Sequence, residues 1–465
     1  MAAQRGEFSS RLGFILAAAG SAVGLGNIWK FPFEVGNGGG GAFVVMYLLF
    51  CFLLCFPVMV SEIAIGRKTQ RNAVGAFYAL NKPRWSFIGK LGILSGFLIL
   101  SFYNVVAGWA FGYVVEMMMG NFDIGNHFGE FVSDWFKVGM YGLVFMGTTA
   151  YIVSHGIQKG IERAAKLLMP SLIIIMIILL AYAVTLDGAM DGIKFYLVPD
   201  FSKITGPVVY SALGQAFFSL SLGMGALITY GSYLGKDQNI VQSAAMITLM
   251  DVGIAFLAGL MLFPFVFSQG VEPTGGAGLI FITLPGVFEE LGPNIGVIVG
   301  TLFFLLLSFA ALTSTVSLLE VPVAYVVDEH NVPRKRAVWL TAILIFVIGI
   351  PSLLSNGASS ILTNFIQIIG IAQEGATDHS FMTLVGWIAN DTFLPFGGMM
   401  ISIFVAYIWK KENLAEELSH GAPDYKGSLI EKYINFAISY LAPVVLSAIF
   451  VLTVLNRFFG IDVMG

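Results

Sequence analysis

The stretch Gly20-Ser21-Ala22-Val23-Gly24-Leu25-Gly26-Asn27 decides how the rest of the sequence is interpreted. It lies inside an apolar segment that starts near Leu12 and ends at Pro32. A helix in a membrane satisfies its own backbone hydrogen bonds, because lipid offers no other partner. Three glycines, a serine and an asparagine in one such segment therefore predict a helix that opens at mid-membrane and presents carbonyl and amide groups to something polar.

The composition excludes a soluble globular protein. Of the 465 residues, 57% are hydrophobic and 11% are charged, whereas soluble domains carry roughly a quarter charged residues. Apolar runs of about 20 residues predict an all-α polytopic membrane protein with about 11 transmembrane helices. The runs fall near 11–36, 41–66, 88–118, 138–156, 167–187, 208–234, 240–268, 296–327, 337–355, 381–409 and 433–458. An apolar piece at 279–291 is too short to span and predicts a hairpin of short helices on the outer face.

The charged residues between these runs predict the topology. With a cytoplasmic N-terminus, most of the 24 Lys and Arg fall on the cytoplasmic side, for example in 67–90, 159–166 and 334–336. The opposite loops carry mainly acidic residues, as in 123–134. Because positive charge accumulates in cytoplasmic loops, we expect a multi-pass membrane protein with its N-terminus in the cytoplasm and, for eleven spans, its C-terminus outside.

The glycine pattern of the first run has a counterpart later in the chain. Gly24-Leu25-Gly26 returns, five predicted helices later, as Gly223-Met224-Gly225, and both triplets follow small polar residues. One such triplet is often only a close-packing feature, but two matched interruptions are typical of transporters built from inverted repeats. We expect one domain, 1–465, with repeats at 11–187 and 208–410, an additional helix 11 at 433–458, and helices 1 and 6 unwound at mid-membrane.

Ionisable residues inside a span are costly, which makes them candidates for function. Glu62, near the inner end of helix 2, either accepts hydrogen bonds from amides freed by a helix break or extends toward Arg67. Asp251 lies among apolar residues of helix 7 with no path to water, which favours a bound cation. Glu320 is a further acid in the inner half of helix 8.

Helix 8 also carries hydroxyl groups on nearly one face, at Thr313, Ser314 and Ser317. Hydroxyls in membrane helices often bond to carbonyls of their own helix. Hydroxyl and carbonyl oxygens are also the ligands that a small hard cation such as Na+ prefers. Both interpretations remain open from the residues alone.

Other classes of site are not indicated by the residues. The two cysteines and five histidines show no metal-ligand spacing, and Gly38–Gly41 lacks the Lys-Ser/Thr of a phosphate loop. A channel would need a continuous polar stripe, and an enzyme would need a nucleophile and base or metal ligands. We expect no organic cofactor, no nucleic-acid partner and no catalytic residues.

With both glycine breaks, Glu62 and the hydroxyls in view, the sequence resembles bacterial amino-acid transporters of the neurotransmitter:sodium symporter family, which have the leucine-transporter fold. The resemblance covers the whole chain from Arg11 onward. It rests on the motifs Arg11–Pro32, Gly38–Phe43, Glu62–Arg67, Lys159–Arg163 and Gly214–Tyr233.

The resemblance implies two sodium sites and a substrate site between them. The first sodium site would comprise Ala22, Asn27, Ser219 and Asp251, and the second Gly20, Val23, Ala310, Thr313 and Ser314. The substrate residues would be Ser21, Ala22, Gly24, Leu25, Gly26, Ile99, Tyr103, Phe218, Ser219, Ser221, Met224, Ser314, Ser317 and Leu318. Amine transporters of the family place an acid where this chain has Gly24, so the resemblance favours a substrate with its own carboxylate.

The pocket expected from this resemblance carries no charged side chain, and Met224 is adaptable. We therefore expect a neutral, large apolar or aromatic L-amino acid. Relatives that require chloride have a neutral cavity beside the first sodium site, whereas Asp251 supplies an anion there. We therefore expect transport to be independent of chloride.

The resemblance also implies two gates. At the outer gate the family pairs an Arg of helix 1 with an Asp of helix 10, but here those positions are Lys30 and Gly386, with Asp391 further along and Gln215 nearby. The inner gate would comprise Arg5, Ser232, Tyr233 and Asp328. Gly160 and Pro170 match a helix 5 feature associated with a water path to the second sodium.

The function expected is sodium-coupled uptake by alternating access, with one amino-acid substrate and two Na+ as partners in a lipid bilayer. The location expected is a bacterial inner membrane, and the chain would be a monomer or a dimer. A proton-coupled transporter of the same fold, with Asp251 or Glu62 titrating, and a non-transporting amino-acid sensor are the alternatives.

Overall fold

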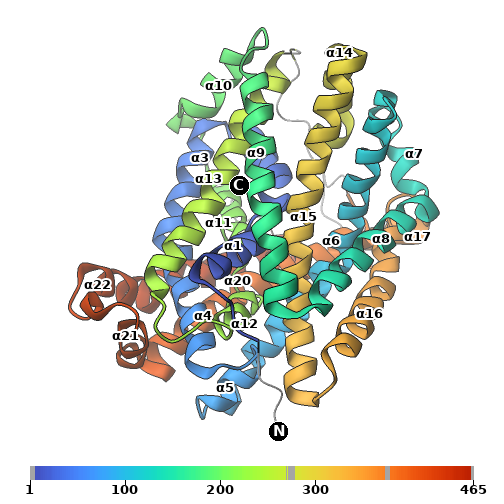
Figure 1. Ribbon diagram of the computed structural model, residues 1–465. Coiled ribbons are helices and arrows are strands. Elements are labelled where there is room, and N and C mark those ends of the chain that lie inside the picture. Colours follow the sequence, from blue (N-terminus) through green and yellow to red (C-terminus); the bar gives the residue numbers. More distant parts are fainter. Residues whose placement is uncertain (1–5, 269, 271–277, 372–377, 462–465) are drawn as a thin grey trace.

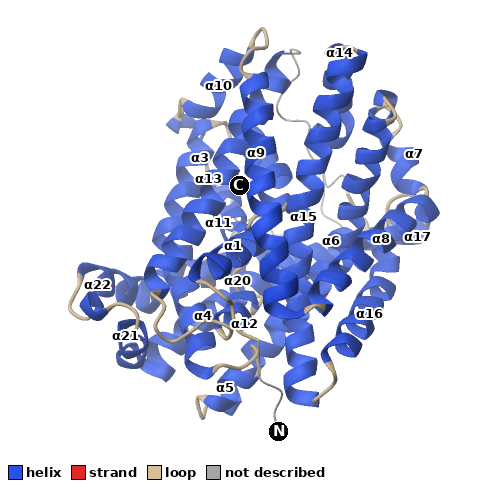
Figure 2. Cartoon of the chain, in the orientation of Figure 1, coloured by secondary structure: helices blue, strands red, loops and turns tan. Residues whose placement is uncertain are grey.

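A computed structural model describes residues 6–268, 270, 278–371 and 378–461, and this part of the chain is almost entirely helical (Figures 1 and 2). Nine of its helices are long and apolar enough to cross a membrane. They are α3–α4 (Gly41–Thr69), α6 with a preceding turn (Pro83–Met118), α8 (Trp135–Ser154), α9 with a preceding turn (Ile157–Ala183), α13 (Ile240–Ser268), α15 (Pro293–His330), α16 (Arg334–Leu354), α19–α21 (Phe381–Ser419) and α22–α23 (Leu429–Phe459).

Two further spans are interrupted at the predicted positions. In the first, α1 (Arg11–Ala22) ends before Val23, and the helical segment Gly26–Asn37, which includes α2 (Phe31–Asn37), continues at an angle of 53°. In the second, α11 (Gly206–Ser219) and α12 (Ala226–Gly231) are separated by residues 220–225. Counted with the nine continuous helices of the described residues, these two interrupted spans agree with the prediction of about eleven.

The break between α11 and α12 requires glycine for a steric reason. Gly223 and Gly225 have φ angles of +78° and +74°, a left-handed conformation that residues with a Cβ rarely adopt. A Cβ on Gly223 would also lie 2.3 Å from the carbonyl oxygen of Leu394 in α20 (Leu394–Ile403). The glycines therefore let the opened backbone pass close to helix 10.

Glu62 accepts one of the hydrogen bonds that this break releases. It is fully buried in α4 (Phe56–Thr69), and its Oε1 accepts from the backbone N–H of Gly223 at 2.8 Å. Of the two predicted roles, the structure therefore supports that of an acceptor. Arg67, the other candidate partner of Glu62, pairs instead with Glu417.

The broken helices lie inside the bundle, and lipid-facing side chains cover its outside. Figure 1 shows α15 between α9 and α6 (Ser86–Met118), and α1 packs against α9, α13 and α15. On the outer surface α9 exposes Ile174, Ile177 and Ile178, and α16 exposes Ile343 and Leu344. Burial of both breaks is what allows their backbone groups to remain unwound at membrane depth.

The ends of the spans define two sides of the molecule. We call the end that carries the basic loops, where Figure 1 labels α5, the inner end, and the opposite end the outer end. Short helices connect the spans. One of them, α5 (Gly75–Ala79), lies at the inner end. The others are α7 (Phe128–Ser133), α10 (Ala189–Leu197), α17 (Ser360–Thr363) and α18 (Phe365–Ile368).

The apolar piece predicted as a hairpin forms a helical turn at Leu279–Thr283 followed by α14 (Leu284–Glu290). It packs against the outer end of α6, where the Tyr113 hydroxyl donates to the carbonyl of Phe281 at 2.9 Å. This is one helical arm. A second arm would fall in residues 271–277, outside the described residues.

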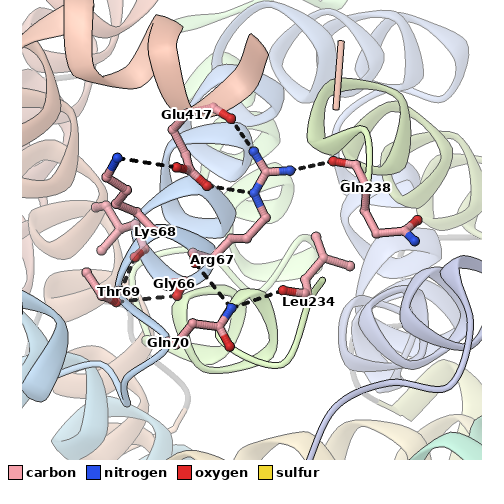
Figure 3. A network of polar contacts seen from close by, with 9 residues as sticks. Gly66, Arg67, Lys68, Thr69, Gln70, Leu234, Gln238 and Glu417 are labelled. Carbon is pink, nitrogen blue, oxygen red and sulfur yellow. Dashed lines mark hydrogen bonds and ion pairs between the residues drawn. The ribbon is translucent and has the colours of Figure 1, made fainter. Parts of the chain in front are cut away.

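A buried arginine joins two spans and the loop before α13 (Ile240–Ser268) at the inner end (Figure 3). Arg67, at the end of α4, is fully buried, and its Nε donates to Glu417 Oε1 of α21 (Lys411–Ser419) at 2.7 Å. Its two terminal nitrogens donate to the backbone carbonyls of Gln238 and Glu417. Gln70 extends this network, because its side-chain amide donates to the carbonyl of Leu234 at 3.0 Å.

We predict that Arg67→Lys lowers the free energy of unfolding by about 2 kcal/mol. A lysine keeps the charge but cannot make three separately directed hydrogen bonds, and hydrogen bonds to charged groups contribute about 1.5–3 kcal/mol. Thermal denaturation of the purified protein measures the change. Lys68→Gln is the control, since Lys68 Nζ lies 3.7 Å from Glu417 Oε2 on the exposed side of the network. Equal melting temperatures for both variants would contradict the prediction.

Candidate substrate and sodium sites

The break in helix 1 presents its backbone to side chains of two other spans and to its own Asn27. The N–H of Leu25 donates to the Tyr103 hydroxyl of α6 at 2.8 Å. The N–H of Gly24 donates to the side-chain oxygen of Asn27 at 3.0 Å. From α11, Gln215 donates to the carbonyl of Gly26 at 2.7 Å. The unwound backbone is thus held open by tyrosine, asparagine and glutamine side chains.

A first group of oxygen atoms lies on one side of this break. Asn27, Ser219 of α11 and Asp251 of α13 come together: the Ser219 hydroxyl lies 2.9 Å from Asp251 Oδ2, and Asn27 Nδ2 lies 2.7 Å from Asp251 Oδ1. Tyr47 of α3 (Gly41–Phe50) completes the group with its hydroxyl 3.2 Å from Asp251 Oδ2. Ala22, which was predicted for the same group, lies in the wall of the adjoining cavity.

The charge in this group has no cationic side chain beside it. Asp251 is fully buried, and no Lys or Arg among the described residues forms an ion pair with it. The Asn27 amide nitrogen, a neutral hydrogen-bond donor, lies where a cation would otherwise be expected. It faces three oxygens at 2.7–3.2 Å, namely Asp251 Oδ1, the Asp251 carbonyl and Ser219 Oγ. A buried carboxylate without a cation is costly, so these residues suit a small cation.

A second group of oxygens lies on the other side of the break, between α1 and α15. The Thr313 hydroxyl lies 2.9 Å from the Ala310 carbonyl and 3.2 Å from the Val23 carbonyl. The Ser314 hydroxyl also lies 3.2 Å from the Val23 carbonyl. Gly20 faces the same place, because a Cβ there would lie 3.2 Å from Thr313 Cβ. These neutral oxygens are of the type that Na+ prefers.

A small cavity separates the two oxygen groups. Its walls comprise Ser21, Ala22, Gly24, Gly26, Ile99, Tyr103, Phe218, Ser219, Ser221, Met224, Ser314 and Leu318, all of them predicted substrate residues. The cavity volume is about 20 Å³, which is room for about one water molecule. The structure is therefore closed around this point.

The other two predicted substrate residues lie beside this cavity and not in its walls. Leu25 bonds to Tyr103 through its N–H. The Ser317 hydroxyl accepts a hydrogen bond from the Ser21 hydroxyl at 2.7 Å. Ser317 also lies 2.9 Å from the carbonyl of Ser314, so it supports the cavity from behind.

A larger cavity of about 350 Å³ has Lys30, Gln215 and Asp391 in its walls. Lys30 reaches over the Phe218 ring, with 4.8 Å between Nζ and the ring centroid. No acid of helix 10 pairs with Lys30 in the described part of the chain, and a Cβ at Gly386 would meet nothing within 4 Å. Asp391 instead pairs with Arg457 of α23 (Ala442–Phe459) at 3.3 Å. The outer ion pair thus joins helices 10 and 11.

We predict an energetic coupling of about 0.5–1 kcal/mol between Asp391 and Arg457, because their side chains are only 24% and 32% exposed. Thermal denaturation of Asp391→Asn, Arg457→Gln and the double variant measures it. The double variant is expected to lose less stability than the sum of the two single variants. Additive losses would show that the pair contributes nothing.

The described inner-gate residues lie near further polar groups at the inner end. The Tyr233 hydroxyl donates to Glu320 at 2.7 Å, and Glu320 also pairs with Arg334 of α16. Asp328 accepts from the Asn72 side chain at 3.2 Å. Ser232 donates to a carbonyl of its own helix, that of Thr229. Arg5 lies outside the described residues.

Sequence reasoning missed three residues of these groups, namely Tyr47, Arg334 and Arg457. Arg457 had a usable signal, because it is a charged residue near the outer end of the last span. Tyr47 had none, since a tyrosine in an apolar helix is most often a packing residue. Arg334 was assigned only to a basic loop, and the structure shows it pairing with the buried Glu320.

The sequence matches the family described as the sodium:neurotransmitter symporter family over residues 5–127 and 134–459. The chain belongs to this family. Similar proteins are the uncharacterized sodium-dependent transporter YhdH of Bacillus subtilis (strain 168), 40% identical with 90% of this chain and 91% of the relative covered, and the uncharacterized sodium-dependent transporter MJ1319 of Methanocaldococcus jannaschii, 34% identical with 97% and 91% covered.

Among solved structures, the chain resembles the crystal structure of MhsT in complex with L-phenylalanine. The TM-score is 0.86 at 40% sequence identity, and the match covers 96% of this chain and 99% of that one. This symporter therefore has the predicted leucine-transporter fold. Membership of the family also confirms a sodium-dependent membrane transporter and not an enzyme.

Proposed function

We propose that this symporter takes up a neutral, large apolar or aromatic L-amino acid together with sodium ions bound at two sites. The observation that carries the proposal is the closed cavity at the break in helix 1, with one oxygen group on each side of it. A substrate there would contact backbone and Tyr103, and both ions would lie against the same break.

The cavity suits a carboxylate of the substrate at Tyr103 and the opened helix. Backbone N–H groups at an opened helix end attract anions. Gly24 leaves no room for an acidic side chain, because even a Cβ would lie 2.3 Å from Ser314 Oγ and 2.6 Å from Tyr103 OH. A substrate that supplies its own carboxylate fits this arrangement better than a simple amine.

The rest of the cavity suits a neutral side chain. Ile99, Phe218, Met224 and Leu318 contribute apolar walls, and no charged residue lines the cavity. The solved relative MhsT was crystallised with L-phenylalanine. Both facts support an aromatic or large aliphatic amino acid, for which the present 20 Å³ cavity must widen when Phe218 and Met224 move.

Each of the two oxygen groups would bind one sodium ion. Asp251 supplies a full negative charge at the first site, with Asn27, Ser219 and the Ala22 carbonyl as its neighbours. The second site would use the neutral oxygens of Val23, Ala310, Thr313 and Ser314, with the Gly20 carbonyl. Because both groups contact the break in helix 1, bound ions stabilise the backbone that contacts the substrate, which couples the two.

We predict that uptake is unchanged when chloride is replaced by gluconate. Asp251 lies beside Tyr47 and Ser219, so a negative charge already balances the first sodium ion, and opposite charges about 4 Å apart attract by about 4 kcal/mol at an effective dielectric near 20. Uptake of labelled substrate into proteoliposomes in the two salts tests this. A collapse of uptake in gluconate would contradict the role of Asp251.

The proposed function is tested by binding of labelled amino acids to the purified protein. We expect phenylalanine, tryptophan, tyrosine, leucine or methionine to bind in sodium and not in potassium, and glutamate and lysine to bind in neither. Binding led by an acidic or basic amino acid would overturn the substrate class.

Proteoliposome uptake separates the alternatives. A sodium gradient should drive uptake into the proteoliposomes. In the cell, we propose that the N-terminus and the basic loops lie on the cytoplasmic side of a bacterial inner membrane. Uptake driven by a pH gradient without sodium would indicate proton coupling. Binding without uptake under any gradient would indicate a sensor.

A further inference from the structure

A groove of about 390 Å³ lies between the inner ends of α8 and α9 (Arg163–Ala183), in the lower half of the bundle in Figure 1. Its lining is basic at one end and apolar at the other. The residues are Tyr151, Ile152, His155, Lys159, Gly160, Arg163, Ala164, Leu167, Leu168 and Leu312. It shares no residue with the cavity at the break in helix 1.

The basic end brings together side chains from both helices. His155 caps the end of α8, Lys159 lies in the π-helical turn Ile157–Glu162, and Arg163 begins α9. All three are exposed, and no ion pair of Lys159 or Arg163 occurs among the described residues. Among the described residues, the groove therefore presents two permanent positive charges that form no ion pair.

The nearest acid is turned away from the groove. Glu162 precedes Arg163, but it is buried, and its carboxylate pairs with Lys166 at 2.6 Å and accepts from the Ser9 backbone N–H at 2.8 Å. Its charge is therefore already balanced on the side facing α1. This leaves the positive charges of the groove for an external anion.

The apolar end continues from these charges along the lipid-facing surface. Leu167 is 68% exposed, and Leu168 and Leu312 form the floor behind it. Tyr151 is exposed and lies against the His155 ring, with 4.5 Å between the ring centroids. A ligand that fits the groove as a whole is anionic at one end and apolar at the other.

The backbone explains why the groove exists. A Cβ on Gly160 would lie 2.1 Å from the carbonyl oxygen of Ile152, so the π-helical turn can pack this closely on the last turn of α8 only because residue 160 is a glycine. The wider turn then directs Lys159 and Arg163 to the outside of this contact.

We propose that this groove binds the phosphate headgroup of an anionic phospholipid from the inner leaflet. Basic pockets between membrane helices on the cytoplasmic side are suited to such headgroups. The phosphate would lie between Lys159 and Arg163, and an acyl chain would lie along Leu167 and Leu312. A soluble phosphate would use only the basic end and would leave the apolar end exposed.

Native mass spectrometry of the detergent-purified full chain tests the proposal. The probes are phosphatidylglycerol, phosphatidylcholine and inorganic phosphate. We expect the protein to retain phosphatidylglycerol in preference to phosphatidylcholine. The double variant Lys159→Gln/Arg163→Gln is expected to bind phosphatidylglycerol about tenfold more weakly, since basic residues at a membrane surface each contribute severalfold.

Lys335→Gln/Arg336→Gln is the matched control. It removes two exposed charges from the same inner end, at the start of α16, and should leave lipid retention unchanged. Equal retention by the two double variants would overturn the site. Displacement of the lipid by millimolar inorganic phosphate would overturn the lipid as its occupant. A melting temperature within a few degrees of the parent shows that each variant is folded.

Discussion

Asp251→Asn is expected to weaken sodium-dependent substrate binding by about 1000-fold. The variant keeps the volume of the side chain and removes the charge that lies among Asn27, Ser219 and Tyr47. A unit charge about 4 Å from a sodium ion contributes about 4 kcal/mol at an effective dielectric near 20, and each 1.36 kcal/mol is a factor of ten. Sodium titration of substrate binding by the purified variant measures this effect.

Thr248→Val is the control for this experiment. Thr248 is buried on the same helix, and its hydroxyl donates only to the sulfur of Met59, at 3.7 Å. The control should bind sodium as the parent does. If Asp251→Asn gives a sodium titration within threefold of the control, the first sodium site lies elsewhere.

Gly24→Ala is expected to weaken substrate binding by at least about 100-fold. The added methyl group would lie 2.3 Å from Ser314 Oγ and 2.6 Å from Tyr103 OH, so both side chains must move. Their movement breaks the Leu25–Tyr103 hydrogen bond and separates Ser314 from the Val23 carbonyl. Overpacking and lost hydrogen bonds of this kind cost about 1–3 kcal/mol and about 1 kcal/mol respectively, and 2.7 kcal/mol corresponds to about 100-fold.

Saturation binding of labelled substrate measures the Gly24 effect, and Gly253→Ala is the matched control. A Cβ at Gly253, in the middle of α13, meets nothing within 4 Å, and alanine is the better helix former. The control should therefore bind substrate normally and be at least as stable. Similar substrate affinities for the two alanine variants would remove Gly24 from the site.

The sequence was sufficient to predict the spans and both broken helices. In lipid, a helix that opens needs residues that tolerate unwinding and groups that accept the freed hydrogen bonds. These needs are local, and they are visible as Gly24, Gly26, Gly223 and Gly225 in otherwise apolar runs. The structure places the breaks there and supplies Glu62 as an acceptor for the second one.

The residues around the break required the family resemblance as well. Twelve predicted substrate residues line one cavity, although they come from four spans far apart in the chain. No periodicity connects Tyr103 with Leu25 or Thr313 with Val23. Long matching motifs made the connection, because they carry the spatial arrangement of the family with them.

The charged pairs at the two ends were the part that sequence reasoning did not find. Asp391 lies further along helix 10 than the position expected to pair with Lys30, and it pairs with Arg457 of helix 11. Arg334 was assigned only to a basic loop, and it pairs with the buried Glu320 of helix 8. The sequence places several basic or hydroxyl groups at the same membrane depth as each of these acids, so it does not specify which of them forms the contact.

The sequence by itself thus determined that the chain spans a membrane and where two of its helices open. Tertiary structure alone decided which charges pair, as in Arg67 with Glu417 and Asp391 with Arg457. The physical reason is that backbone hydrogen bonding is local in the sequence, whereas ion pairing between spans is not. Backbone hydrogen bonding in lipid is satisfied within one helix and leaves a pattern in its residues. An ion pair between spans depends on how each helix is rotated and tilted against its neighbours, which packing of the whole bundle sets.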